Sequence, residues 1–212
     1  MILAAGRGER MRPTTDSVPK ALLPARGRPL IEYHFAALTR AGITEVVINL
    51  GWRGEQIRDH VGDGRRFAVS VSYSEEGYPP LETGGGIQRA LPLLGAEPFW
   101  LINGDVFCEF RFDARGLAAG VLAHLVLVPN PAHHPDGDFG LAGGLIADAA
   151  ANRSTYSGIA VIHPRLLAGY EPGRFPLAPL LRAAASRRQV TGELFTGLWN
   201  AVGTPERLAA LG

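Results

Sequence analysis

The 212-residue sequence has one cysteine, Cys108, and one lysine, Lys20. One cysteine excludes an intramolecular disulfide, and no apolar run is long enough to cross a bilayer without interruption. The formal net charge is only +1, and no run rich in lysine and arginine stands out. Such a charge balance argues against a nucleic-acid partner. These absences favour a cytoplasmic protein that binds neither membranes nor nucleic acids.

What is present is an alternation of short apolar runs with helical patterns. The patterns predict strands over residues 1–5, 45–49, 69–74, 99–103, 124–128 and 157–162, and helices over 29–41, 53–61, 84–94, 176–186 and 205–211. Residues 191–195 and 198–202 flank Thr196-Gly197 in the manner of a β-hairpin. With 46% hydrophobic residues, the chain can form one substantial core. We therefore predict a single α/β domain over residues 1–212, with a Rossmann-like, mainly parallel mixed sheet sandwiched by helices.

A glycine-rich turn follows the first apolar run. Gly6 and Gly8 allow close approach of the backbone to a ligand, and Arg10 and Lys20 supply fixed positive charge, as a triphosphate requires. A dinucleotide-binding loop would have glycine or alanine at Met11 and an acidic residue at Asn49, and a Walker loop would have Gly-Lys-Ser or Gly-Lys-Thr. The sequence has neither pattern, so an NAD-type oxidoreductase is disfavoured.

Ordered motifs along the chain resemble the sugar-1-phosphate nucleotidyltransferases. They are Leu-Ala-Ala-Gly-x-Gly-x-Arg-Met-x-Pro-x-Thr (3–15), Pro-Lys-x-Leu-Leu-Pro (19–24), Thr-Gly-Gly-Gly (83–86), Asn-Gly-Asp (103–105) and Trp-x-x-Val-Gly-Thr-Pro-Glu (199–206). Segments 81–87, 130–140 and 156–159 look like the members that act on N-acetylmuramic acid α-1-phosphate. The resemblance implies a GT-A type fold, Mg²⁺ as cofactor, and transfer of UMP from UTP to that sugar phosphate in bacterial cell-wall recycling.

The same resemblance implies roles for individual residues. Arg10 would neutralise the β- and γ-phosphates, Lys20 would lie near the reacting phosphates, and Asp105 would hold Mg²⁺. The nucleotide would contact Leu3, Ala4, Ala5, Gly6, Gly8, Glu9, Glu82, Thr83 and Gly85, and the sugar would contact Asn103, Asp138, Gly140 and Ser157. Two structural alternatives stay open: Glu82 and Thr83 as helix-capping residues, and Asp105 as a residue that only shapes a turn.

The chemistry needs little acid–base assistance. A sugar 1-phosphate is ionised near neutral pH, so its oxygen attacks the α-phosphorus in line without a general base. Repulsion between the two anionic substrates is the obstacle, and catalysis should come from positioning and charge neutralisation. We therefore expect Asp105 to lie close to Arg10 or Lys20.

One position departs from the family pattern. Aligning Trp199 with Val202–Glu206 puts Ala201 where the family has a second metal-binding aspartate. Three explanations account for this alanine: an engineered substitution, a natural variant that uses water in place of the ligand, or an inactive homologue that only binds nucleotide.

A second function within the same class also stays open, namely a thymidylyl- or guanylyltransferase for another hexose 1-phosphate. Adjacent His133 and His134 lack the spacing of zinc ligands. A monomer is the simplest expectation.

Overall fold

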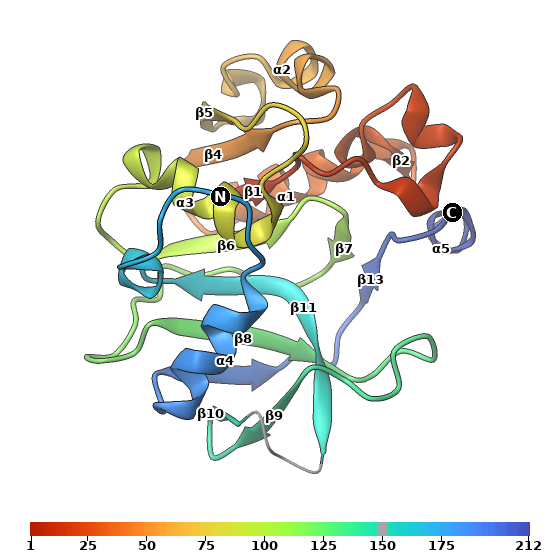
Figure 1. Cartoon of the computed structure of the whole chain (residues 1–212). Helices are drawn as coiled ribbons and strands as arrows, with labels where there is room; N and C mark the ends of the chain where they lie inside the picture. The colour runs from red at the N-terminus through yellow and green to blue at the C-terminus, as the bar shows by residue number, and fades with distance from the viewer. Residues whose placement is uncertain (148–151) are drawn as a thin grey trace.

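A computed structural model describes residues 1–147 and 152–212. Its main element is a mixed nine-stranded sheet with the strand order β5-β4-β1-β6-β11-β8-β12-β10-β9 (Figure 1). The strands are β1 (Ile2–Leu3), β4 (Glu45–Leu50), β5 (Ser70–Glu75), β6 (Phe99–Asn103), β8 (Ala123–Val128), β9 (Phe139–Ala142), β10 (Leu145–Ala147), β11 (Arg153–Ile162) and β12 (Val190–Leu194). Two small antiparallel ribbons pair β2 (Pro24–Ala25) with β3 (Arg28–Pro29) and β7 (Val106–Cys108) with β13 (Trp199–Ala201).

Helices cover both faces of the sheet. They are α1 (Leu30–Arg40), α2 (Gly54–Val61), α3 (Glu82–Leu94), α4 (Ala178–Ser186) and α5 (Pro205–Ala209), with 3₁₀ turns η1 (Glu9–Met11), η2 (Thr14–Asp16), η3 (Lys20–Leu22), η4 (Arg65–Phe67) and η5 (Pro164–Leu167). The predicted helices are thus present, with shifted ends. Within the described residues, no helix is both long and apolar enough to cross a membrane.

Successive side chains of the central strands pack into two separate hydrophobic cores, one on each face of the sheet. Leu101 packs with α3 and α4, whereas its neighbour Ile102 packs with α1 and α2. The same alternation separates Leu125 from Val126 in β8, because successive side chains of a strand point to opposite faces. A third, smaller cluster joins the N-terminal loop to β7 and α5 through Met11, Leu23, Ala25, Leu30, Phe107, Val202 and Leu211.

Strand direction differs between the two halves of the sheet. β5, β4, β1 and β6 pair in parallel, and β12 is parallel to β8. β11 is antiparallel to both β6 and β8, and β10 is antiparallel to β9 and β12. The prediction of a mixed sheet between helices is confirmed, but parallel ladders dominate only the half that contains β1.

The hairpin predicted around Thr196-Gly197 is wrong. β12 lies in the large sheet beside β8, whereas β13 leaves it to pair with β7, with Ala201 opposite Val106. Phe195 continues the pairing to β8 through its N–H to Leu127 O (2.8 Å) and packs edge-on against Phe110. The pairing of β12 with β8 and of β13 with β7, together with the Phe195–Phe110 contact, therefore outweighs the turn preference of Thr196-Gly197.

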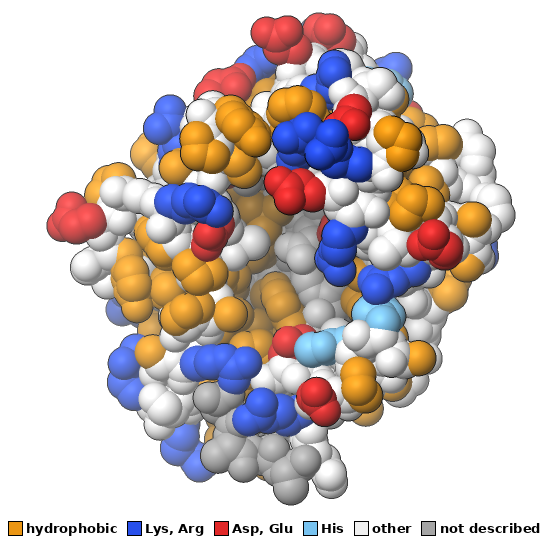
Figure 2. Space-filling model, turned by 45° about the vertical axis from the view of Figure 1, so that its right-hand side comes forward, with side chains coloured by type: hydrophobic (Ala, Val, Ile, Leu, Met, Phe, Trp, Pro, Cys, Tyr) orange, Lys and Arg blue, Asp and Glu red, His pale blue; other side chains and the backbone are white. Residues whose placement is uncertain are grey.

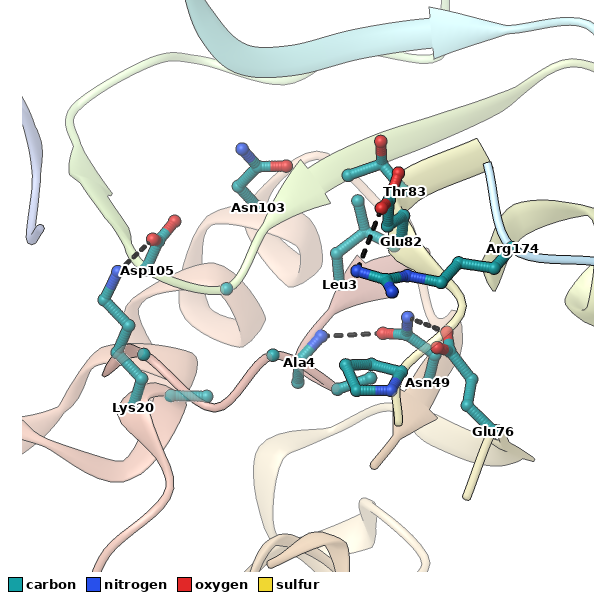
Figure 3. Close-up of a pocket in the computed structure, with 16 residues that line it drawn as sticks. Leu3, Ala4, Lys20, Asn49, Glu76, Glu82, Thr83, Asn103, Asp105 and Arg174 are labelled. Atoms are coloured by element: carbon teal, nitrogen blue, oxygen red, sulfur yellow. Dashed lines mark hydrogen bonds and ion pairs between the residues drawn. The ribbon is translucent and has the colours of Figure 1, made fainter. Parts of the chain in front are cut away.

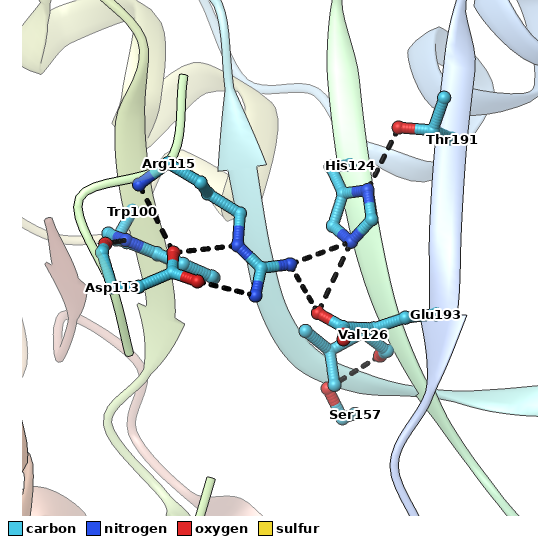
Figure 4. Close-up of polar contacts among 8 residues, drawn as sticks. All are labelled: Trp100, Asp113, Arg115, His124, Val126, Ser157, Thr191 and Glu193. Carbon is cyan, nitrogen blue, oxygen red and sulfur yellow. Dashed lines mark hydrogen bonds and ion pairs between the residues drawn. The ribbon is translucent and has the colours of Figure 1, made fainter. Parts of the chain in front are cut away.

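A polar cluster fastens the segment after β7 onto the sheet (Figure 4). Arg115 donates to both carboxylate oxygens of Asp113 at 2.7 and 2.8 Å and to Glu193 Oε1 at 2.5 Å. Glu193 also lies 3.3 Å from His124 Nε2, whose Nδ1 is 2.9 Å from Thr191 Oγ1. The guanidinium of Arg115 holds the pKa of Asp113 below its usual value. Glu193 is therefore a structural residue of this cluster.

Candidate active site

A cavity of about 280 Å³ opens where β1, β4 and β6 end (Figure 3). Parallel strands end at the same edge of a sheet, which is where α/β proteins bind ligands. The cavity is lined by Leu3, Ala4, Ala5, Gly6, Gly8, Lys20, Ala21, Asn49, Glu76, Pro80, Glu82, Thr83, Asn103, Gly104, Asp105 and Arg174. The structure thus brings together most of the nucleotide-binding residues predicted from the sequence. Glu9, Arg10 and Gly85 do not line it.

Backbone contacts shape the glycine loop after β1. Gly8 has a left-handed backbone (φ 67°), and a Cβ on it would lie 3.2 Å from Cδ of Lys20. Thr15 Oγ1 donates to Gly8 O (2.9 Å), and Trp52 Nε1 donates to Thr15 O (2.9 Å). The loop is therefore held against the lysine that follows it.

Lys20 and Asp105 form an ion pair on the floor of the cavity, shown by a dashed line in Figure 3. Lys20 comes from η3, and Asp105 from the turn between β6 and β7, 85 residues later. The Lys20 side chain is 14% exposed and that of Asp105 is 32% exposed, so each remains accessible to a ligand. The expected proximity of Asp105 to a cationic side chain is confirmed.

A hydrogen-bonded chain crosses the cavity wall beneath the glycine loop. Ala4 N–H donates to Asn49 Oδ1 (2.6 Å), Asn49 Nδ2 donates to Glu76 Oε1 (2.5 Å), and Glu76 Oε2 accepts from the Leu81 N–H (2.8 Å). The sequence interpretation missed Glu76, although its place after a strand and before Gly77-Tyr78-Pro79-Pro80 is a signal for a binding loop. This chain fixes β1, β4 and the start of α3 relative to one another.

The Thr83–Gly86 motif mainly serves close packing. A Cβ on Gly84 would lie 2.5 Å from the Phe175 ring, and one on Gly85 would lie 2.1 Å from Gly173 O. Thr83 Oγ1 accepts from the Leu177 N–H at 2.9 Å. Gly85 therefore lets residues 173–177 lie against α3.

Glu82 and Thr83 do not cap α3. The residue before the helix is Leu81, and no side chain caps its N-terminus. Glu82 instead has a left-handed backbone (φ 62°) and pairs with Arg174 at 3.1 Å across the cavity. Both side chains line the cavity, as the nucleotide-binding interpretation requires.

Arg10 lies in a neighbouring basic patch. A Cβ on Gly203 would stand 3.5 Å from Nη2 of Arg10 and 2.9 Å from Nη1 of Arg207. Burial lowers the pKa of His133, and the charges of Arg207, His134 and Arg10 lower it further. Arg10 thus lies near Gly203 and Arg207, outside the residues that line the main cavity. Figure 2 shows basic and histidine side chains beside the hollow on the face that it draws.

The residues present fit a magnesium ion held by one carboxylate. Asp105 is the carboxylate next to Lys20, and the described residues contain no group of three potential His, Cys, Asp or Glu ligands. Mg²⁺ keeps several waters and typically uses one or two carboxylates together with substrate phosphates. Ala201 lies beside this site, because Val202 N–H donates to Asp105 O at 2.8 Å.

The predicted sugar contacts are only partly brought together. Asp138 lines a cavity of about 200 Å³ that shares Leu3, Thr83 and Asn103 with the main cavity. Ser157 is 1% exposed, and its hydroxyl donates to Val126 O (2.6 Å) and accepts from Ile159 N (3.1 Å) at a bulge in β11. Gly140 is a buried residue of β9. Ser157 and Gly140 line neither cavity, so their sugar-binding roles gain no support from the structure.

Burial raises the pKa of the Cys108 thiol to about 11, so little thiolate is present at neutral pH and a nucleophilic role gains no support.

The chain is similar to known proteins over most of its length. The Nucleotidyl transferase family model matches residues 1–142. A Neisseria meningitidis serogroup B protein named N-acetylmuramate alpha-1-phosphate uridylyltransferase is 48% identical over 98% of this chain and 94% of its own length. A protein of that name from Caulobacter vibrioides is 33% identical over 99% of this chain and 94% of its own.

The chain belongs to the nucleotidyl transferase family. This membership confirms the resemblance carried by the ordered motifs. Among solved structures, a Bacillus anthracis protein assigned as a glucose-1-phosphate thymidylyltransferase superposes with a TM-score of 0.83 at 19% identity, over 99% of this chain and 92% of that one. UDP-glucose pyrophosphorylase bound to UDP-glucose gives a TM-score of 0.77 at 20% identity, over 99% and 95%. These similarities show a shared Rossmann-like fold with a mixed sheet.

Proposed function

We propose that the protein transfers UMP from UTP to N-acetylmuramic acid α-1-phosphate and releases pyrophosphate. The observation that carries this proposal is the Lys20–Asp105 pair at the floor of a cavity walled by the glycine loop. The name of the 48% identical Neisseria relative supplies the choice of base and sugar. The reaction belongs to cell-wall recycling, and we place it in the cytoplasm with a monomeric enzyme.

The reaction forms one bond and breaks one bond at the α-phosphorus. An oxygen of the sugar phosphate attacks that atom, and the bond to the oxygen bridging the α- and β-phosphates breaks, with its electron pair leaving on pyrophosphate. No proton needs to move, because the attacking group is already ionised. The protein therefore contributes position and positive charge.

Named residues supply these contributions. Lys20 neutralises charge at the reacting phosphates, and Arg10 meets the phosphate tail from the rim. The glycine loop presents backbone at Ala4 to Gly8, and Glu82 and Thr83 face the nucleoside. Asp105 would hold Mg²⁺, which when bound supplies further positive charge against phosphate oxygens. Asn103 is placed to contact a sugar hydroxyl.

A matrix of substrates tests the proposal. Pyrophosphate release is measured for UTP, dTTP and GTP against the 1-phosphates of N-acetylmuramic acid, N-acetylglucosamine, glucose and mannose, with Mg²⁺. We expect the highest kcat/KM for UTP with N-acetylmuramic acid 1-phosphate. A higher value for dTTP or GTP with a hexose 1-phosphate contradicts the proposal. Binding of UTP without turnover on any acceptor identifies a nucleotide-binding module instead.

A further inference from the structure

A further cavity, of about 380 Å³, lies beside β13 and α5. Ala201, His133 and Arg207 are among the residues that line it. The residue that follows β13 connects it to the proposed reaction centre, because the N–H of Val202 donates to Asp105 O at 2.8 Å. The cavity therefore adjoins the turn that carries the proposed metal ligand.

This cavity lies at the phosphate end of the main one. In the proposed function Glu82 and Thr83 face the nucleoside, and Figure 3 shows both residues at the end of the main cavity opposite to Lys20 and Asp105. β7 begins directly after Asp105 and pairs with β13, so β13 and α5 stand at the Asp105 end (Figure 1). A triphosphate whose α-phosphorus lies beside Lys20 therefore extends its last two phosphates toward β13 and α5.

Two guanidinium groups converge in this direction. A Cβ on Gly203 would lie 2.9 Å from Nη1 of Arg207 and 3.5 Å from Nη2 of Arg10. Arg207 comes from α5 and Arg10 from η1, so two segments almost two hundred residues apart bring positive charge to one place. Glycine at position 203 leaves the space between the two side chains open.

Neither of these guanidinium groups is neutralised by an acidic side chain. Over residues 1–147 and 152–212, no carboxylate oxygen lies within 4.0 Å of Arg10 or Arg207. By contrast, Arg7 and Arg12 of the same N-terminal loop both pair with Asp16. An anion between Arg10 and Arg207 would relieve their mutual repulsion and accept charge-assisted hydrogen bonds from both.

The other contacts of Arg207 leave most of its donors unused. Its Nη1 donates to Ala201 O at 3.4 Å, the single side-chain hydrogen bond that it makes within the described part of the chain. The adjacent acid is Glu206, whose pKa is lowered first by its hydrogen bond with Thr204 and least by the charge of Arg207. Because a guanidinium has five N–H donors in a planar fork, Arg207 can also bind phosphate oxygens.

We propose that Arg207, together with Arg10, binds the β- and γ-phosphates of UTP, which leave as pyrophosphate. The bond from the α-phosphorus to the bridging oxygen breaks with its electron pair on the leaving group, so negative charge grows beside these two cations. This inference rests on the proposed function and adds Arg207 to the residues that contact its substrate.

A comparison of UTP with UMP tests this assignment, because UMP has the same nucleoside and α-phosphate but lacks the two leaving phosphates. Titration calorimetry with Mg²⁺ and without acceptor measures both affinities. Arg207→Gln should weaken UTP binding about 10-fold or more, the cost of losing a charge-assisted hydrogen bond, and leave UMP binding nearly unchanged. Arg207→Lys keeps the charge but loses the planar fork, so it should show a smaller loss for UTP alone.

Arg40→Gln is the control, because it removes the same charge from an exposed position at the end of α1 and Arg40 lines neither cavity. It should leave both affinities unchanged. Thermal unfolding checks that each variant is folded, and Arg207→Lys supplies the result if Arg207→Gln is not.

Equal weakening of UTP and UMP, or no weakening of UTP, would overturn the inference. Unchanged UTP affinity with a raised KM for the sugar phosphate would instead assign Arg207 to the acceptor. If the unmodified protein binds UTP but releases pyrophosphate with no acceptor, the proposed function fails, and the two affinities still decide whether Arg207 binds the terminal phosphates.

Discussion

At the scale of single residues, the site is organised around charge. Lys20 is the only lysine in the sequence, and it pairs with Asp105 from a distant turn. In this ion pair, Asp105 supplies the negative charge that a phosphate would bring to Lys20, and Lys20 supplies the positive charge that a metal ion would bring to Asp105. In the proposed reaction, a magnesium triphosphate would exchange this internal pair for contacts with substrate. The pair therefore keeps both groups in place before substrate arrives.

Replacing Lys20 by Met should lower kcat by about 10²- to 10³-fold, the range found when one electrostatic group is removed from a catalytic site. The aliphatic stem that packs beside Gly8 is retained in methionine, so the fold should survive. Pyrophosphate release with saturating UTP and Mg²⁺ measures the effect. An Arg12→Gln variant is the control, because Arg12 is exposed and pairs with Asp16 on the surface. A Lys20→Met enzyme with unchanged kcat would contradict a role at the reacting phosphates.

Replacing Ala201 by Asp should lower the Mg²⁺ concentration that gives half-maximal activity. Ala201 lies opposite Val106 and next in the chain to the residue that bonds Asp105 O, so a carboxylate there would stand near the proposed metal site. Magnesium titrations of activity measure the change, with Ala201→Asn as the uncharged control. Unchanged magnesium dependence in the Asp variant would show that this alignment of β13 is wrong.

At the scale of elements, the site depends on close packing between α3 and residues 173–177. Gly84 and Gly85 place helix backbone directly against this segment, and Thr83 bonds its Leu177 N–H. Arg174 reaches the cavity from the same segment and pairs with Glu82. One wall of the nucleotide cavity is thus built by two elements about ninety residues apart in sequence.

A methyl group at Gly85 should disrupt this packing. The Cβ of Gly85→Ala would lie 2.1 Å from Gly173 O, which is backbone and must move. Overpacking of this kind costs about 1–3 kcal/mol, so the free energy of unfolding should fall by that amount, and UTP binding should weaken as the wall shifts. Gly116→Ala is the control, because no atom lies within 4 Å of its added Cβ. Urea unfolding and UTP titration provide the two measurements, and equal effects of the two variants would refute the packing role.

At the scale of the whole molecule, a buried histidine of α1 lies against the turn that carries Asp105. His34 of α1 is 2% exposed and lies beneath this turn. Burial lowers its pKa to about 4, against opposing effects of the Asp105 charge and the Gly104 backbone. The imidazole is therefore neutral in the folded protein at neutral pH.

Overall stability should accordingly fall on acidification between about pH 6.5 and pH 4. The pKa of His34 is lower in the folded than in the unfolded state, so the unfolded chain binds more protons in this range and is stabilised relative to the folded protein as pH falls. The shift corresponds to a loss on the order of 3 kcal/mol. Urea unfolding at several pH values measures it, with His34→Leu expected to flatten the dependence. Identical pH profiles for the two proteins would exclude His34 as the cause.

The sequence by itself determined the family, the helices, most strands and the glycine loop with Lys20 and Asp105. The helices and strands are local features that periodicity predicts, whereas the family and the roles of Lys20 and Asp105 follow from the resemblance of the ordered motifs. Only tertiary structure decided that β13 pairs with β7, that Ser157 stabilises a bulge, that Gly84 and Gly85 accept residues 173–177, and that Arg10 and Arg207 converge beside Gly203. Each of these outcomes depends on contacts between segments distant in the chain, whose energies exceed local turn and capping preferences.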